Sequence, residues 1–266
     1  MTEAANIKNL GHGITAVRAD NSGPLTLTGT QTYVIGNERI VILDPGPADQ
    51  THLDRIQHVV EGRTVEAVCL THAHSDHSAA AGLATHRWGP LRASAETLER
   101  LNLQGVPLVD EETIALSKEF TLHALNSPGH SGDHLSYFVE STRDLFTGDL
   151  VLGEGSTMIA APDGSVRAYL QSLAKLLALQ PGRLIPGHGP VVDAASERIE
   201  ESRVHRLKRI EQVIMALQEG ADSVESIRQA IYSDLPLSHH VAANLTIRAY
   251  LEYLAEEGHK LPILTA

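Results

Sequence analysis

Residues 71–77 read Thr71-His72-Ala73-His74-Ser75-Asp76-His77, directly after the apolar run Val65-Glu66-Ala67-Val68-Cys69-Leu70. Imidazole and carboxylate groups are ligands that suit zinc and related divalent metals. The i, i+2 spacing of His72 and His74 aims two ring nitrogens at one point from a loop at a strand end, and Asp76 and His77 face a second point nearby. Such a motif rarely arises by chance even in a chain with 15 His, so it predicts a metal site rather than a solvated cluster.

Two adjacent metal ions would still lack one nitrogen each and a shared oxygen. His130 lies in a turn of small residues that lets the backbone bend close to an ion, and Asp149 follows a strand-like segment. His188 sits where an apolar run opens into a Gly/Pro loop. A lone His or Asp at a strand end is more often structural or solvated than functional. Together, and in this order, the three are specific candidates.

With these motifs the chain resembles the metallo-β-lactamase superfamily of dinuclear metal hydrolases, over residues 44–190. The resemblance implies two divalent metal ions, with zinc as the first choice and iron or manganese as alternatives. It further implies one ion on His72, His74 and His130, a second on Asp76, His77 and His188, and Asp149 as the bridge. One departure is visible, because Ala79-Ala80 stands where the family often has Gly-Gly. Alanine still allows close helix packing, so the resemblance is only slightly weakened.

The segment Ile40–Gly46 is similar to the family's early strand, which ends in an aspartate that usually orients a metal ligand. Here that aspartate is Asp44. A plain strand followed by a turn explains the segment equally well.

Short β-branched or apolar runs alternate with helical stretches as far as about residue 195. Strands are predicted at 14–17, 32–35, 39–43, 67–70, 122–125, 135–139 and 144–146, and helices at 50–61, 94–101 and 166–179. This pattern indicates an α/β or α+β fold, and the resemblance implies a four-layer αββα sandwich.

The composition changes after Pro190, where strand signals become few. Amphipathic helices are predicted at 202–218, 224–231 and 238–256, followed by a short strand-like wing at 260–266. We therefore expect a catalytic domain over residues 1–195 and a small domain over 196–266 that resembles the winged helix of one β-lactamase-like branch of the superfamily.

A run of cations lies in this small domain, because residues 203–209 hold Arg203, Arg206, Lys208 and Arg209. A winged helix with such a run invites a nucleic-acid interpretation. Glutamates flank the run, however, and pairing within a solvated helix explains it more often than a phosphate groove does. We expect the domain mainly to shape one wall of a substrate cleft.

The composition restricts the classes of partner. A net charge of −12 argues against broad, nonspecific binding to phosphate backbones, although a local basic groove stays compatible with it. The first ten residues lack a basic segment followed by an apolar one, and no segment approaches the length of a membrane span. We expect a cytoplasmic protein without membrane association or an obligate protein partner, acting on a small acyl substrate or on RNA.

The predicted reaction is hydrolysis. A water shared by two metal ions has its pKa lowered from 15.7 towards about 7, so it can attack a carbonyl or phosphoryl centre as hydroxide. Asp76 is predicted to orient this nucleophile. His134 is predicted either to assist the developing charge as a catalytic residue or to support a ligand. Weaker candidates for the substrate wall are Tyr169, His12, His239 and His240.

Several substrate classes stay open, because one fold and one metal site serve many reactions. They are β-lactam hydrolysis as a main or side activity, thioester hydrolysis of the hydroxyacylglutathione type, and RNA cleavage. The resemblance weighs against a dedicated secreted β-lactamase, since those enzymes usually lack a bridging Asp and carry an export signal. A metal-stabilised binding protein is the alternative outside enzymes.

Overall fold

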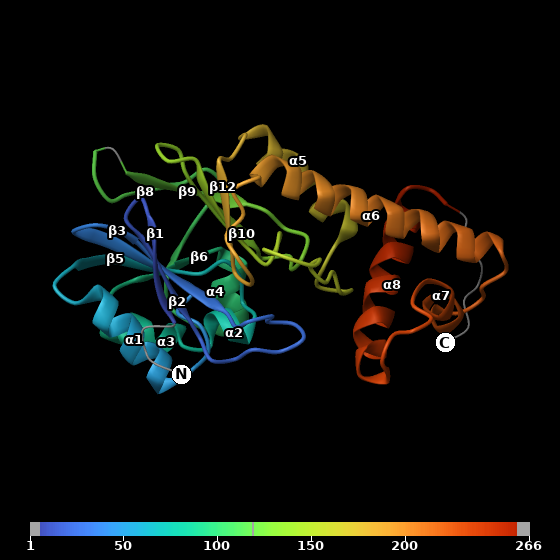
Figure 1. The fold of residues 1–266 in the computed structure, drawn as a ribbon, viewed down its shortest axis with the longest axis horizontal. Helices are drawn as coiled ribbons and strands as arrows, with labels where there is room; N and C mark the ends of the chain where they lie inside the picture. The colour runs from blue at the N-terminus through green and yellow to red at the C-terminus, as the bar shows by residue number, and fades with distance from the viewer. Residues whose placement is uncertain (1–5, 119, 260–266) are drawn as a thin grey trace.

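The computed structural model describes residues 6–118 and 120–259. Figure 1 shows a body of two sheets with flanking helices, from which one long helix leads to a smaller helical part. None of the helices in these residues is long and apolar enough to cross a membrane.

Two sheets form the centre of the body. The first has the strand order β1 (Ile7–Gly11), β2 (Ile14–Arg18), β3 (Gln31–Gly36), β4 (Arg39–Leu43), β5 (Thr64–Cys69), β6 (Leu91–Ala93) and β7 (Val106–Pro107). The second has the order β12 (Arg183–Pro186), β11 (Asp144–Gly148), β10 (Leu135–Val139), β9 (Thr121–Asn126) and β8 (Thr113–Ala115).

Helices occupy the outer layers and the C-terminal part. They are α1 (Gln50–Val60), α2 (Ser75–Ser78), α3 (Ala81–Arg87), α4 (Ala95–Leu101), α5 (Val166–Ala178), α6 (Ala195–Gln218), α7 (Val224–Ile231) and α8 (His240–Glu256), with a 3₁₀ turn, η2 (Leu237–His239), before α8.

Three apolar cores separate the layers. One lies between the two sheets and includes Tyr33, Tyr137 and Phe146. A second joins the first sheet to α1, α3 and α4. The third joins the second sheet to α5 and α6. This order of layers is the predicted αββα sandwich, and the fold class is confirmed.

The predicted elements agree with the structure to within a few residues, with two informative exceptions. Helix α6 begins at Ala195 rather than at residue 202, because Ala195 and Ile199 are buried in the third core. Residues 237–239 form a 3₁₀ turn, so the α-helix that was predicted to begin at residue 238 begins at His240. Sequence reasoning missed β6, β7 and β8, which are two or three residues long, and also β1 and β12, which have five and four residues.

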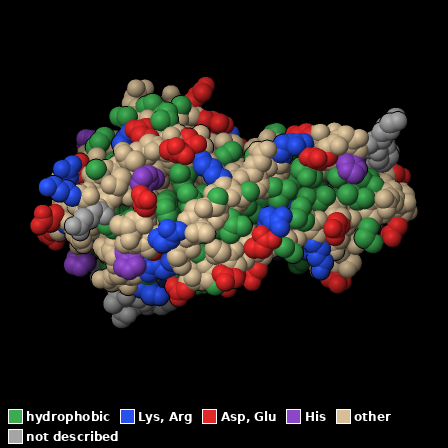
Figure 2. Space-filling view, turned by 90° about the horizontal axis from the view of Figure 1, so that it is seen from above, with side chains coloured by type: hydrophobic (Ala, Val, Ile, Leu, Met, Phe, Trp, Pro, Cys, Tyr) green, Lys and Arg blue, Asp and Glu red, His purple; other side chains and the backbone are tan. Residues whose placement is uncertain are grey.

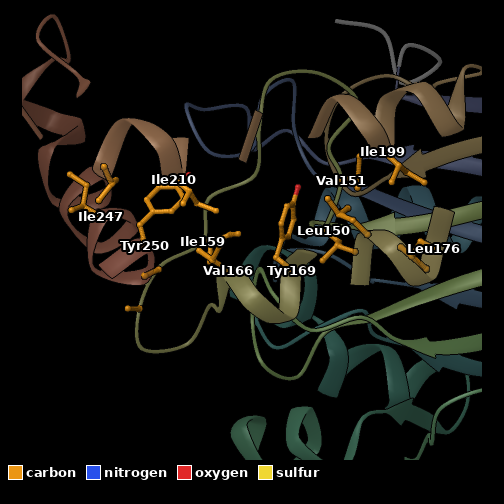
Figure 3. Packing of buried hydrophobic residues seen from close by; sticks show 14 of the residues in the cluster. Leu150, Val151, Ile159, Val166, Tyr169, Leu176, Ile199, Ile210, Ile247 and Tyr250 are labelled. Carbon is orange, nitrogen blue, oxygen red and sulfur yellow. The ribbon is translucent and has the colours of Figure 1, made fainter. Parts of the chain in front are cut away.

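The C-terminal helices are joined to the body by a continuous apolar cluster. Figure 3 shows it running from Ile247 and Tyr250 through Tyr169 to Leu176. The expected boundary at residue 195 coincides with the start of α6, which belongs to both parts. The three predicted C-terminal helices are present, but the winged-helix topology is not confirmed, and its wing at 260–266 lies outside the described residues.

The surface differs between the two parts. Figure 2 shows a larger lobe and a narrower C-terminal lobe, with hydrophobic side chains gathered on the upper face of the narrower one. Two large apolar side chains of α6, Val204 and Met215, are more than half exposed.

Ile247→Ala tests this packing. Ile247 is fully buried in the third core, so its truncation should lower the free energy of unfolding by about 2–5 kcal/mol. Val241→Ala on the same helix is the control, because Val241 is 71% exposed, and it should change the free energy by less than about 0.5 kcal/mol. Chemical denaturation measures both, and equal effects would contradict the packing described here.

Candidate metal centre

Parallel strand pairs bring the candidate ligands to one edge of the sandwich. Strands β4 and β5 are parallel, as are β11 and β12, so their carboxyl ends meet at common edges. The loop after β5 carries His72 and His74, and helix α2, which follows it, carries Asp76 and His77; the loops after β11 and β12 carry Asp149 and His188. His130 comes from the loop between β9 and β10.

The predicted residues come together as three overlapping groups. Within each group, one ligand atom from every residue lies within 4.8 Å of the others. The groups are His72, His74 and His130; His72, His77 and Asp149; and Asp76, His77 and His188. All seven predicted ligands are therefore neighbours, and each group could hold a metal ion.

Hydrogen bonds at Nδ1 leave the Nε2 atoms of three histidines for the centre of the cluster. The Nδ1 partners are Thr71 Oγ1 for His72 (2.9 Å), Asp44 Oδ2 for His77 (2.8 Å) and the carbonyl oxygen of Met158 for His130 (2.7 Å). Because the Thr71 hydroxyl donates to Asp44, it accepts from His72. Each ring therefore carries its proton on Nδ1 and presents a lone pair on Nε2.

These lone pairs face one another. His130 Nε2 lies 3.0 Å from His74 Nδ1, and His77 Nε2 lies 3.3 Å from His188 Nε2. Asp149 Oδ1 lies 3.3 Å from Nε2 of both His77 and His188. Each of these close pairs is stable with a proton or a metal ion between its atoms.

Two buried atoms of the cluster lack any hydrogen-bond partner among the described residues. They are Nε2 of His72 and Oδ1 of Asp149. Burial lowers the pKa of His72 well below its ordinary value, so the ring stays neutral and available as a ligand. A divalent cation would satisfy both atoms, and the residues present fit a metal site.

The electrostatics of the other ligands agree with this. Burial alone would lower the pKa of His77, but the carboxylates of Asp149 and Asp44 outweigh it and raise that pKa well above the ordinary value. Burial likewise opposes protonation of His188, but the carboxylates of Asp149 (3.3 Å) and Asp76 (3.1 Å) nevertheless raise its pKa to about 9. This side of the cluster therefore attracts positive charge, either as protons or as metal ions.

Asp44 connects the end of β4 to the cluster. It accepts hydrogen bonds from the Thr71 amide (2.7 Å) and hydroxyl (2.8 Å) and from His77 Nδ1. The aspartate of the early strand thus orients a candidate ligand, as the resemblance implied, and is more than part of a turn.

His134 lies behind the cluster rather than in the open site. It is fully buried, its Nδ1 lies 3.0 Å from Ser127 Oγ, and its Nε2 accepts the Asp149 amide at 3.2 Å. Burial, together with the nearby His130, lowers its pKa well below the ordinary value, so the ring stays neutral. Both of its nitrogens are occupied, and this geometry suits a residue that positions Asp149.

Sequence reasoning missed several contacts of the cluster. Thr30 Oγ1 donates to Asp76 (3.1 Å), and Asp163 Oδ2 lies 3.6 Å from His74 Nε2. Gly187 is required by crowding, because a Cβ there would lie 2.7 Å from Asp149 Oδ1 and from His77 Cε1. Of these three residues, only Gly187 was indicated by the sequence, because it belongs to the Gly/Pro loop around His188.

The weaker candidates for the substrate wall lie elsewhere. Tyr169 is buried in the third core, and His12 bonds to Asp144 at the start of β11, the strand end opposite Asp149. His240 bonds to the carbonyl of Leu235, whereas His239 lines a separate pocket. None of the four lines the pocket at the cluster.

That pocket has a volume of about 600 Å³. Its floor holds ligands from both sides of the cluster, including His74, Asp76 and Asp149. Its walls are largely apolar and come from the loop before β3 and the loop after β11, with side chains of Leu25, Leu27, Leu152 and Met158. The cluster is therefore open to a molecule with an apolar part.

Asp44→Asn tests the cluster as a metal site. The Asn amide nitrogen cannot accept a hydrogen bond from His77, so this ligand loses its orientation. Zinc affinity, measured by competition with a chromogenic chelator, should fall about 10–100-fold. Asp54→Asn on the exposed side of α1 is the control and should leave the affinity unchanged. Unaltered affinity in Asp44→Asn would contradict the geometry.

Comparison with known proteins agrees with the geometry. The family model of the metallo-beta-lactamase superfamily matches residues 25–188. The beta-lactamase-like protein 2 homolog of Caenorhabditis elegans is 29% identical over 272 residues, which cover 97% of this chain and 89% of the relative. An atrochrysone carboxyl ACP thioesterase of Aspergillus chevalieri is 30% identical over 237 residues, covering 84% of this chain and 74% of the relative.

Solved structures extend the likeness to the fold. The crystal structure of a beta-lactamase domain protein from Burkholderia ambifaria superposes with a TM-score of 0.84 at 19% identity, covering 97% of this chain and 90% of the other. The sandwich fold, the ligand cluster and the family match together place the chain in the metallo-beta-lactamase superfamily, to which it belongs.

Proposed function

We propose that this protein is a metal-dependent hydrolase that binds two divalent ions and cleaves an acyl thioester. Zinc is the first choice for these ions, and iron or manganese are the alternatives. The observation that carries the proposal is the cluster of seven ligands at the floor of a largely apolar pocket. Such a pocket accommodates an acyl chain beside the reacting centre.

The two ions would be held by the groups described above, with Asp149 between them. When bound, they would activate a shared water as hydroxide and polarise the carbonyl oxygen of the substrate. Asp76 lies at the pocket with part of its carboxylate exposed, so it can accept a proton from the attacking water and orient it. His134 accepts the backbone amide of Asp149 and thereby positions the Asp149 carboxylate, which would lie between the ions, so it is a positioning residue.

Two observations favour a thioester over the other substrates. One relative is named an ACP thioesterase, and it matches most of this chain. The apolar walls of the pocket and the net charge of −12 also suit an acyl group better than a strand of RNA. Hydrolysis would add water across the C–S bond, giving a carboxylate and a thiol.

His74→Ala and Asp149→Ala test the assignment of ligands. Each removes a group from the cluster, so thioester hydrolysis should fall by at least about 10²–10³-fold while circular dichroism stays native. His58→Ala, on the exposed side of α1, should retain full activity. Full activity in either of the first two variants would refute the assignment.

A panel of substrates tests the reaction class. Protein of known metal content is offered an acyl thioester, S-lactoylglutathione, nitrocefin, a lactone, a phosphodiester and a short RNA. We expect turnover of thioesters that a chelator abolishes. Chelator-sensitive cleavage of RNA without thioester turnover would establish the nuclease alternative, and nitrocefin as the best substrate would establish a β-lactamase.

A further inference from the structure

A second pocket adjoins the one at the metal cluster. It has a volume of about 200 Å³ and lies between α6, η2 and α8. Both pockets are lined by Ser156, Thr157 and Met158. The carbonyl of Met158 holds His130, and the carbonyl of Thr157 accepts from Arg206. A single segment of chain thus separates the candidate metal centre from the second pocket.

The charge of this pocket is opposite to that of the chain. Its lining includes Arg206, Arg209, His205 and His239, and it includes no carboxylate. The chain as a whole has 33 Asp and Glu against 21 Lys and Arg. Four basic side chains without an acidic one are therefore a local feature, and we call this the cationic pocket.

Arg206 is a buried cation without a counter-charge. It is 2% exposed, and within residues 6–118 and 120–259 no carboxylate lies at ion-pair distance from it. Its guanidinium donates to Tyr250 Oη (2.6 Å) and to the Thr157 carbonyl (2.8 Å) and lies over the rings of Tyr169 and Tyr250. Its buried Nε has no partner among the described residues. Burying such a charge is costly unless an anion approaches it.

The neighbouring groups strengthen the positive potential. Arg209 stacks on Tyr232 at 4.6 Å and bonds to the neutral Gln212, so its charge also stays uncompensated there. His205 adds no charge of its own, because burial lowers its pKa and the nearby cations, Arg206 first, lower it further, so the ring stays neutral. Ala242 and Ala243 in the first turn of α8 line the pocket, where the helix dipole adds partial positive charge.

We propose that the cationic pocket binds a phosphate group carried by the thiol arm of the thioester substrate. The proposal rests on the proposed function, because the acyl group would occupy the apolar pocket while the arm passes residues 156–158. Arginine binds phosphate through several parallel hydrogen bonds, and a phosphate would supply the counter-charge that Arg206 and Arg209 lack.

The pocket also revises the interpretation of residues 203–209. Arg203 does pair with Glu200 (2.6 Å), as expected for a solvated helix face. Arg206 and Arg209 instead point to the side of α6 that lines the pocket. Arg203 of this run therefore belongs to an ion-paired helix surface, whereas Arg206 and Arg209 line the cationic pocket.

The experiment compares S-acetyl-4′-phosphopantetheine with S-acetylpantetheine, which differ only in the phosphate. We expect the metal-loaded enzyme to show a kcat/KM about tenfold or more higher for the phosphorylated substrate. Arg209→Gln and Ala242→Glu should abolish this preference without changing hydrolysis of S-acetylpantetheine. Ala242→Glu is the second variant in case Arg209→Gln misfolds. We expect it to fold, because a carboxylate is tolerated in the first turn of a helix. Arg203→Gln, on the same helix but paired outside the pocket, should keep the preference.

Binding of a thioether pair separates this inference from the proposed function. Calorimetry with S-methyl-4′-phosphopantetheine and S-methylpantetheine needs no catalysis. Tighter binding of the phosphorylated ligand that Arg209→Gln abolishes would support the pocket even if no thioester were hydrolysed. Thioester turnover with equal use of both substrates and no effect of Arg209→Gln would overturn the inference and leave the proposed function intact. Cleavage of a short RNA that depends on Arg209, without any phosphate preference among thioesters, would also overturn it.

Discussion

The structure depends on electron-rich groups that meet at the carboxyl ends of parallel strands. Hydrogen bonds to Asp44 and to the Met158 carbonyl fix the rings of His77 and His130, so their lone pairs point inwards. Asp149 is held against the same point by His134. The close nitrogens at 3.0 and 3.3 Å need a proton or a metal ion between them. The fold therefore holds together a group of side chains that could hold metal ions.

The C-terminal helices take part in this arrangement through the segment 156–158. The carbonyls of this segment bond to His130 on one side and to Arg206 on the other. The same helices share a continuous apolar core with α5, as Figure 3 shows. They therefore support a candidate ligand from behind, although none of their described residues lines the pocket at the cluster.

Local patterns in the sequence predicted the candidate ligands and an α/β or α+β fold, whereas the order of the four layers came from the resemblance to the superfamily. Histidine spacing after an apolar run and Gly/Pro loops at strand ends identified all seven residues that the structure brings together. The sequence left two roles open for His134, and the choice between them depends on its contacts with Ser127 and with the amide of Asp149. The contacts of Thr30 and Asp163 likewise arise only when distant loops close. The cationic pocket was missed because residues 156–158 meet α6 only in three dimensions.

Counting the metal ions bound to each chain tests directly whether the cluster is a site for two ions. Purified protein is loaded with excess zinc and dialysed, and the bound metal is counted per chain by elemental mass spectrometry. We expect two zinc ions per chain, because two of the three ligand groups share no residue, and Asp149 forms the third group with one histidine from each. One ion or none per folded chain would contradict it.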